Sequence, residues 1–120
     1  MSAPRFPRRV YEAGTEPDPR FSLANERTFL AWIRTALALI AAGVALEALA
    51  LPLQRGLRLT ASVLLLVLGL MAPVLAWLTW AATERALRES RPLPGSRVAL
   101  PVAIGVCTAG ILLASGLLLR

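Results

Sequence analysis

The sequence predicts an all-α membrane protein with three transmembrane helices and an interfacial amphipathic extension at the N-terminal end of the first helix. Hydrophobic residues make up 57% of the 120 residues, above the roughly 45–50% typical of soluble domains. They are concentrated in three long segments, and the thirteen basic residues form short clusters between these segments. The net charge of +6 therefore does not indicate a nucleic-acid partner, because a nucleic-acid binder gathers its basic residues on one polar surface.

Residues 1–20 are expected to form a flexible, cytoplasmic tail rich in proline and arginine. The stretch contains four prolines interspersed with charged residues, which leaves too little apolar surface for a core. It lacks the apolar segment and small-residue cleavage site of a signal peptide. The three-span domain is expected to cover residues 21–120.

The first span is expected over residues 29–51. Its charge-free part, residues 35–46, has only 12 residues, so a span must include Arg34, Glu47 or both. Ten large apolar residues each favour insertion by about 0.3–0.6 kcal/mol, which offsets a charge that costs about 2.5–3.5 kcal/mol at the helix centre. A helix that starts at Phe21 is roughly 46 Å long and overshoots the bilayer, so its first two turns are expected among the headgroups.

The second and third spans are expected over residues 59–82 and 98–119, which contain no charged residue. At 1.5 Å per residue they measure roughly 36 and 33 Å, enough to cross a hydrocarbon core of about 30 Å. Pro52 and the polar residues after it predict a short first loop, and Pro92 with its neighbours predicts a second loop.

The distribution of arginine predicts the orientation of the chain. Nine arginines lie in the N-terminal region up to Arg27 and in the second loop, against three in the first loop and at the C-terminus. Because positive residues accumulate on the cytoplasmic side, the N-terminus is expected in the cytoplasm and the C-terminus outside. Trp77 and Trp80 would then lie in the aromatic belt of the cytoplasmic interface.

The first helix carries the residues that point to a function. At 100° per residue, Arg27 and Arg34 lie within about 20° of each other. A row of alanines falls within about 40° of the same direction, whereas the large apolar residues lie toward the opposite side; this row consists of Ala31, Ala38, Ala41 and Ala45. Since small residues mark close packing in lipid, the arginine face is expected to point at protein or at a polar path.

Three interpretations of Arg34 remain open. If the helix leaves the hydrocarbon near Leu51, Arg34 lies about 3 Å inside the boundary and its side chain can reach the headgroups. Alternatively, Arg27 and Arg34 bind anionic groups such as phosphate, or they form an ion pair with another helix. Glu47 is expected to reach outward to the interface, or to contact Arg55, Arg58 or a neighbouring subunit.

The remaining helices offer packing rather than chemistry. Small residues and one proline form a seam on the second span, and small residues form another on the third. The first seam contains Ser62, Gly69, Ala72, Pro73 and Ala76, and the second contains Ala99, Ala103, Cys107, Gly110 and Ala114. The cluster of Glu84, Arg85, Arg88 and Glu89 is expected to be a solvated helix extension with i,i+4 pairs.

The composition also bounds the chemistry. The chain has no histidine and one cysteine, so an internal disulfide, a His/Cys metal site and histidine acid–base catalysis are excluded. Cys107 is interpreted as a small apolar filler in the membrane. We therefore expect no cofactor, no metal and no enzymatic activity.

The run from Leu23 to Thr35, LANERTFLAWIRT, resembles the signature of the YidH-like small bacterial inner-membrane proteins, domain of unknown function 202. The resemblance implies a three-helix protein of the bacterial inner membrane with a cytoplasmic N-terminus. The same string is similar to one in the membrane domain of the vacuolar transporter chaperone complex, which makes and moves polyphosphate. The matching positions are Asn25, Glu26, Arg27, Thr28, Phe29, Leu30 and Trp32, with Arg34 nearby. The chain has no separate polymerase domain, so the resemblance does not imply polyphosphate synthesis.

Two functions follow as expectations. In the first, the chain is an oligomeric or accessory subunit of the inner membrane, in contact with the bilayer, with anionic headgroups and with a second copy or another membrane protein. In the alternative, it is a homo-oligomeric channel or exporter for an anion or polyanion that uses Arg27 and Arg34. Three helices alone enclose too little space for a polar path, so the alternative requires a symmetric oligomer.

Overall fold

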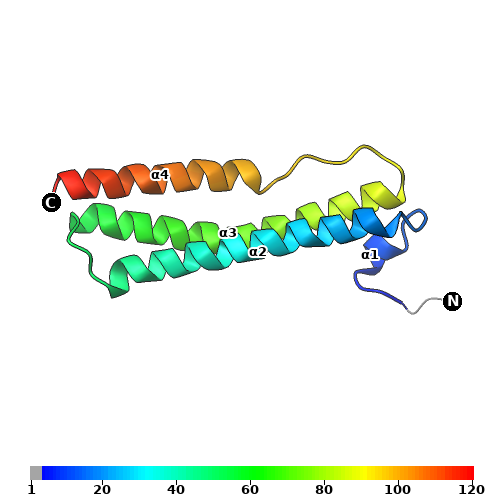
Figure 1. The fold of residues 1–120 in the computed structure, drawn as a ribbon, viewed down its shortest axis with the longest axis horizontal. Coiled ribbons are helices and arrows are strands. Elements are labelled where there is room, and N and C mark those ends of the chain that lie inside the picture. The colour runs from blue at the N-terminus through cyan, green and yellow to red at the C-terminus, as the bar shows by residue number, and fades with distance from the viewer. Residues whose placement is uncertain (1–3) are drawn as a thin grey trace.

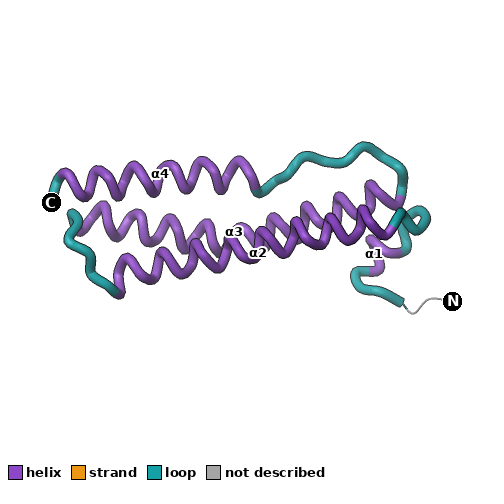
Figure 2. Tube along the Cα trace, in the orientation of Figure 1, coloured by secondary structure: helices purple, strands orange, loops and turns teal. Residues whose placement is uncertain are grey.

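The computed structural model describes residues 4–120, and this part of the chain is all-helical. Its elements are α1 (Arg8–Tyr11), α2 (Pro19–Ala48), α3 (Arg55–Arg88) and α4 (Ala99–Leu118). The three long helices lie side by side with alternating directions, and α1 and the C-terminus lie at opposite ends of a molecule of 63 × 26 × 20 Å (Figures 1 and 2). Each of the three is long and apolar enough to cross a membrane. The predicted fold class is confirmed.

The helix boundaries follow from local capping. Asp18 accepts a hydrogen bond from the main-chain nitrogen of Arg20 at 2.9 Å, and Pro19 occupies the first helical position, so α2 begins two residues before the expected start. The side chain of Gln54 accepts from the nitrogen of Leu57 at 2.7 Å and caps α3 in the same way. α2 ends at Ala48, three residues earlier than expected.

The long helices form a row with α3 in the middle. α3 contacts both neighbours, whereas α2 and α4 do not contact each other in the described part of the chain. Close approach of α2 requires Gly69, because a Cβ atom there would lie 2.5 Å from Cγ1 of Ile40. Ser62 Oγ donates a hydrogen bond of 2.6 Å to the main-chain oxygen of Gly43 across the same interface. The small residues of the second span therefore pack against α2 as expected.

The seam expected on the third span is wrong. Its five residues, Ala99, Ala103, Cys107, Gly110 and Ala114, are exposed. α4 instead contacts α3 through another set that also contains small residues: Val98, Val102, Gly105, Ala109 and Gly116. Small residues occur on both sides of this helix, so their spacing alone does not identify the packed side.

The segment before α2 is packed against α3, where the sequence predicted a flexible tail; Met1–Ala3 of that tail lie outside the described residues. Val10 of α1 is 2% exposed, and the main-chain nitrogen of Thr15 donates to the main-chain oxygen of Arg88 at 2.9 Å. The Arg88 guanidinium donates to the main-chain oxygens of Tyr11 and Ala13 and to Glu16. Arg88, at the end of α3, thus supplies polar contacts that hold this segment against the helix.

The same contacts correct the expectation of a solvated charge cluster. Arg85 and Glu89 form the expected i,i+4 pair at 3.9 Å, but Glu84 and Arg88 are buried, at 3% and 6% exposure. Glu84 faces α2 and Arg88 faces the N-terminal segment, because α2 and α3 continue beside each other beyond the expected spans.

Candidate functional site: the N-terminal half of α2

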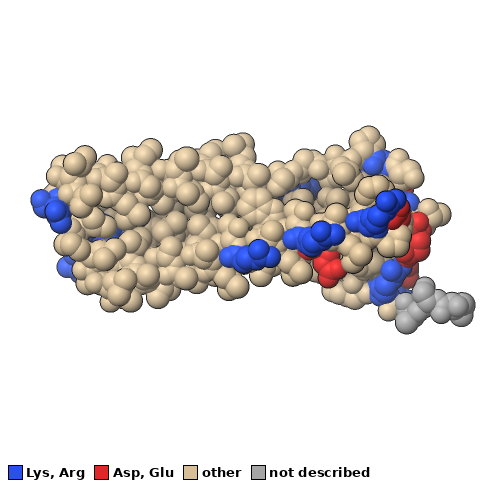
Figure 3. All heavy atoms as spheres, viewed as in Figure 1, with Lys and Arg blue, Asp and Glu red and all other residues tan. Residues whose placement is uncertain are grey.

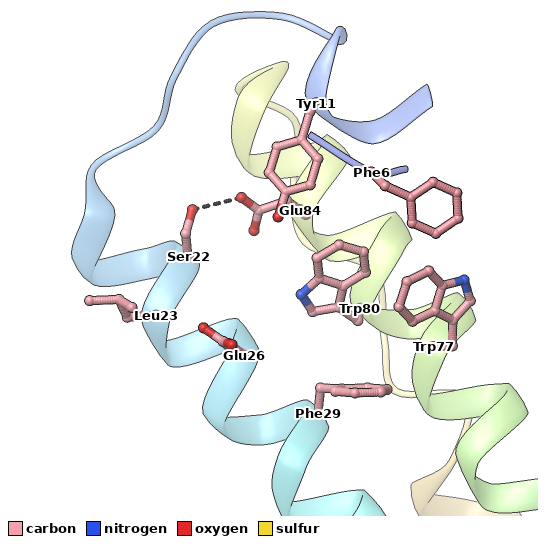
Figure 4. Close-up of a pocket in the computed structure, with 9 residues that line it drawn as sticks. All are labelled: Phe6, Tyr11, Ser22, Leu23, Glu26, Phe29, Trp77, Trp80 and Glu84. Atoms are coloured by element: carbon pink, nitrogen blue, oxygen red, sulfur yellow. Dashed lines mark hydrogen bonds between the residues drawn. The ribbon is translucent and has the colours of Figure 1, made fainter. Parts of the chain in front are cut away.

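Polar contacts of the sequence motif join the N-terminal part of α2 to the C-terminal part of α3. Asn25 Nδ2 donates to the main-chain oxygen of Trp80 at 3.1 Å and to Glu84 Oε2 at 3.3 Å. Ser22 Oγ donates to Glu84 Oε1 at 2.7 Å (Figure 4). The expected interfacial extension is therefore a straight continuation of α2 that packs against α3 (Figure 1).

Two aromatic residues of the motif also face α3. Phe29 and Trp32 are half-buried against the apolar core, and the ring of Phe29 meets Trp77 edge-on at a centroid distance of 6.0 Å. The hydroxyl of Thr28 donates a hydrogen bond to the main-chain oxygen of Ala24, one turn earlier in the same helix. These residues explain part of the motif by packing alone.

The remaining polar residues of the motif lie on the outside. Glu26, Arg27 and Arg34 are exposed, as are Ala31, Ala38 and Ala41. Figure 3 shows basic side chains in a row on this face of the molecule. Arg20, Arg27 and Arg34 are each exposed and seven residues apart, which places them on one line.

Within the single chain, the arginine face lies on the outside of the row of helices, so its contact with protein or a polar path stays a prediction about neighbouring molecules. Ala36 and Gly43, which pack on α3, each follow an arginine by nine residues, or about 900°, so Arg27 and Arg34 point directly away from α3. Leu39, one of the large apolar residues on the side opposite the arginines, is buried in the core together with Ala36. The physical reason is that the glycines of α2 and α3 allow large side chains such as Ile40 to interlock, so small and large residues pack together.

The observed end of α2 changes the depth in the bilayer that we expect for Arg34. Counted back from the end of α2 at Ala48, a 20-residue span begins at Phe29. Arg34 then lies about 7–8 Å inside the boundary rather than about 3 Å. In residues 4–120, no carboxylate lies within 4 Å of the guanidinium of Arg27 or Arg34, so neither forms an ion pair within the chain.

Glu47, at the other end of α2, forms one of the contacts that the sequence left open. Arg58 Nε lies 3.2 Å from Glu47 Oε1, and Arg58 Nη1 donates to the main-chain oxygen of Leu51 at 2.8 Å. The two charges close the first loop and neutralise each other there.

Comparison with known proteins assigns the family. The model of the family described as "Domain of unknown function (DUF202)" matches residues 20–86, which include the whole motif and more than half of the chain. This chain belongs to the DUF202 family. It is 41% identical over 117 residues to inner membrane protein YidH of Escherichia coli K12, covering 90% of this chain and 99% of YidH. It is 45% identical over 97 residues to the uncharacterized protein Rv2272 of Mycobacterium tuberculosis H37Rv, covering 80% of each chain. No solved structure matches.

The match confirms the resemblance noted in the sequence and identifies this DUF202 protein as a small membrane protein.

The sequence did not predict the part of the site that the N-terminal segment contributes, which lies outside the matched residues. Phe6 stacks on Trp77 at 6.3 Å and Tyr11 tilts against Trp80 at 6.2 Å. Two aromatic residues in an otherwise polar tail are the signal that indicates such docking.

Proposed function

We propose that this DUF202 protein is a homo-oligomeric subunit of the inner membrane whose copies meet through the outer faces of α2 and α4. The observation that supports it is the row of helices. Each flanking helix has an exposed stripe of small residues facing away from α3: Ala31, Ala38 and Ala41 on α2, and Ala99, Ala103, Cys107, Gly110 and Ala114 on α4. Small residues permit the close backbone approach that drives helix association in lipid.

Contact between the α2 stripe of one copy and the α4 stripe of the next is favoured over contact between two α2 stripes. Two α2 stripes in contact would bring Arg27 and Arg34 of both copies together, and like charges repel strongly where water is scarce. An α2–α4 contact joins different surfaces, so repetition of the contact closes a ring when the rotation allows it.

A second candidate, a path for an anion or polyanion, is favoured by Arg27 and Arg34 themselves. Their guanidiniums have no carboxylate within 4 Å among residues 4–120, and Arg34 lies inside the expected span. In a ring of copies whose α2 arginine faces line the central axis, bound anions would balance the charge of the guanidiniums. The guanidiniums would in turn replace the water that the anions lose. The motif's resemblance to the membrane domain of the polyphosphate-making complex supports this chemistry.

The arginine count supports a cytoplasmic position for the end that carries α1. Nine arginines lie in the tail, at position 27 and in the second loop, against three in the first loop and at the C-terminus, and this difference favours that orientation. A membrane-impermeant maleimide tests it on intact spheroplasts of a Cys107→Ala chain. We expect Leu119→Cys to be labelled and Ser96→Cys to be labelled only after lysis; the reverse pattern would invert the orientation.

Disulfide cross-linking in membranes distinguishes the two assemblies. Ala38→Cys with native Cys107 should form dimers and longer ladders if α2 meets α4. Ala38→Cys with Cys107→Ala should cross-link only if α2 stripes face one another, as the anion path requires. Val44→Cys is the matched control, since it is exposed on α2 but about 80° from Arg34. Absence of every cross-link, together with a monomeric mass in lipid nanodiscs, would contradict both assemblies.

A further inference from the structure

A cavity of about 270 Å³ lies where the N-terminal segment, α2 and α3 meet. Its walls combine aromatic rings with carboxylates. The rings belong to Phe6, Tyr11, Phe29, Trp77 and Trp80. In Figure 4, Tyr11 and Trp80 lie on one side, and Ser22 and Glu26 of α2 lie on the other.

The two carboxylates of the cavity belong to Glu84 and Glu26. Glu84 is 3% exposed and accepts hydrogen bonds from Ser22 and Asn25, both uncharged. Among residues 4–120, no basic side chain lies within 4 Å of either carboxylate. A buried carboxylate without a cation is costly, and neutral donors offset only part of that cost.

The neighbouring arginines lie at the Tyr11 side of the cavity, where the Cζ atoms of Arg5 and Arg88 are 4.4 and 5.7 Å from the centroid of the Tyr11 ring. Arg5 and Arg88 both bind the carboxylate of Glu16, and Arg88 also binds two main-chain oxygens. Burial and the negative charge of Glu84 raise the pKa of Tyr11, whereas the positive charges of Arg5 and Arg88 act in the opposite direction. The basic groups thus lie at the Tyr11 ring, whereas the side of the cavity formed by α2 and α3 carries the two carboxylates without a basic partner among residues 4–120 and attracts cations.

The rings provide the second half of a cation site. The faces of tryptophan, tyrosine and phenylalanine are negative and attract ammonium groups, most strongly where water is partly excluded. Trp77 and Trp80 stack at a centroid distance of 5.0 Å, and Phe29 meets Trp77 edge-on. An aromatic enclosure with one buried and one rim carboxylate suits an organic ammonium better than a metal ion, which needs several oxygen ligands at short distance.

We propose that this cavity binds an organic ammonium group. The group could belong to the headgroup of an aminophospholipid or to a soluble amine, because both present the same cation. The tryptophans mark the membrane interface, and the rim residues Phe6 and Leu23 are exposed, so the cavity is accessible at headgroup depth. This inference stands independently of the proposed oligomer, since all walls come from one chain.

Intrinsic tryptophan fluorescence tests the proposal with the full chain in nanodiscs of phosphatidylglycerol, which carries no amine. Titration with tetramethylammonium should give a saturable change, because Trp77 and Trp80 line the cavity. Glu26→Gln should weaken binding about tenfold, and Phe29→Leu about three- to fivefold through loss of a ring face. Glu12→Gln, an exposed carboxylate outside the cavity, is the matched control and should bind as the unaltered chain does.

Glu26 is chosen because its exposure makes misfolding of the variant a minor concern; Glu84→Gln is the stronger second variant. Equal tetramethylammonium affinity in the Glu26→Gln, Glu84→Gln and Glu12→Gln chains, or the lack of any saturable signal, would overturn the proposal. Saturable binding of inorganic phosphate that Glu26→Gln and Glu84→Gln weaken to the same extent would also overturn the proposal. Nanodiscs of phosphatidylethanolamine identify the source: competition by the lipid raises the tetramethylammonium midpoint, whereas an unchanged midpoint indicates a soluble amine.

Discussion

Arg88, near the end of α3, hydrogen-bonds through Nη2 to the main-chain oxygen of Tyr11, which precedes it by 77 residues, at 2.7 Å. The same guanidinium donates through Nε to the oxygen of Ala13 at 2.8 Å and through Nη1 to Glu16 at 3.0 Å. One buried side chain thus holds the N-terminal segment against the helix pair. Two of the aromatic walls of the cavity, Phe6 and Tyr11, belong to this segment.

Replacement of Arg88 by alanine should release the N-terminal segment while leaving the three long helices folded. Loss of charge-assisted hydrogen bonds costs about 1.5–3 kcal/mol each, although the released carbonyls regain water. In detergent, trypsin should cleave Arg88→Ala after Arg8 or Arg9 at least about tenfold faster than the unaltered chain. Arg91→Ala, which removes an exposed arginine, is the control; equal cleavage of both variants would contradict the role of Arg88.

The helices of this protein follow from composition, but their packed faces do not. A charge-free run such as residues 59–82 exceeds the bilayer thickness, so it predicts a span without knowledge of any neighbour. The side of α4 that packs depends on α3, and both sides of α4 contain small residues. Likewise, the spacing of Glu84 and Arg88 by one helical turn predicts a solvated ion pair. In the structure, each of these side chains instead binds a partner more than 50 residues away. Contacts of that kind are set by tertiary structure and leave no local periodicity.

Docking of the N-terminal segment should weaken at acid pH. The pKa of Glu16 lies below its ordinary value of 4.5 because Arg5 and Arg88 donate hydrogen bonds to its carboxylate. A lowered pKa in the folded state means that the contribution is complete above the ordinary value and is lost as pH falls through the lowered value. The hydrogen-exchange protection factor of the Thr15 amide, which donates to Arg88, should fall from about pH 6 to about pH 3. In Glu16→Gln the protection factor should be lower throughout and lose most of this dependence; an unchanged profile would exclude Glu16 as its source.

The close approach of α2 and α3 predicts opposite effects for two glycines. Gly69→Ala places a Cβ atom 2.5 Å from Ile40 Cγ1 and 3.1 Å from the main-chain oxygen of Ala36, so the helices must shift apart. We expect a loss of about 1–3 kcal/mol in the free energy of unfolding. Gly95→Ala, in the loop between α3 and α4, meets no atom within 4 Å and should be neutral or slightly stabilising. Unfolding titrations in mixed micelles measure both; equal effects would mean that the contact at Gly69 is not tight.

The hydrogen bond from Ser62 to the main-chain oxygen of Gly43 should contribute modestly. Ser62 is 2% exposed, and interhelical hydrogen bonds in membranes average about 0.6 kcal/mol. Ser62→Ala should therefore lower the free energy of unfolding by about 0.5–1.5 kcal/mol. Thr108→Val is the comparison, because the hydroxyl of Thr108 bonds only within its own helix and is exposed. A larger loss for Thr108→Val than for Ser62→Ala would argue against the α2–α3 interface seen here.

Substitution of Arg34 distinguishes an arginine that only anchors its helix among the headgroups from one that binds anions. A charge inside the span opposes insertion by up to about 2.5–3.5 kcal/mol, so Arg34→Gln should insert at least as well as the unaltered chain.

If the Arg34 side chain only contacts headgroups, its loss should leave anion flux unchanged. If the second assembly is right, Arg34→Gln should reduce anion flux into proteoliposomes by about tenfold or more through loss of a charge-assisted contact. Arg55→Gln at the opposite end should not, since Arg55 is exposed and outside the arginine line. Flux that is equal in both variants, or absent from the unaltered chain, would remove the anion path and leave the α2–α4 assembly as the account of this face.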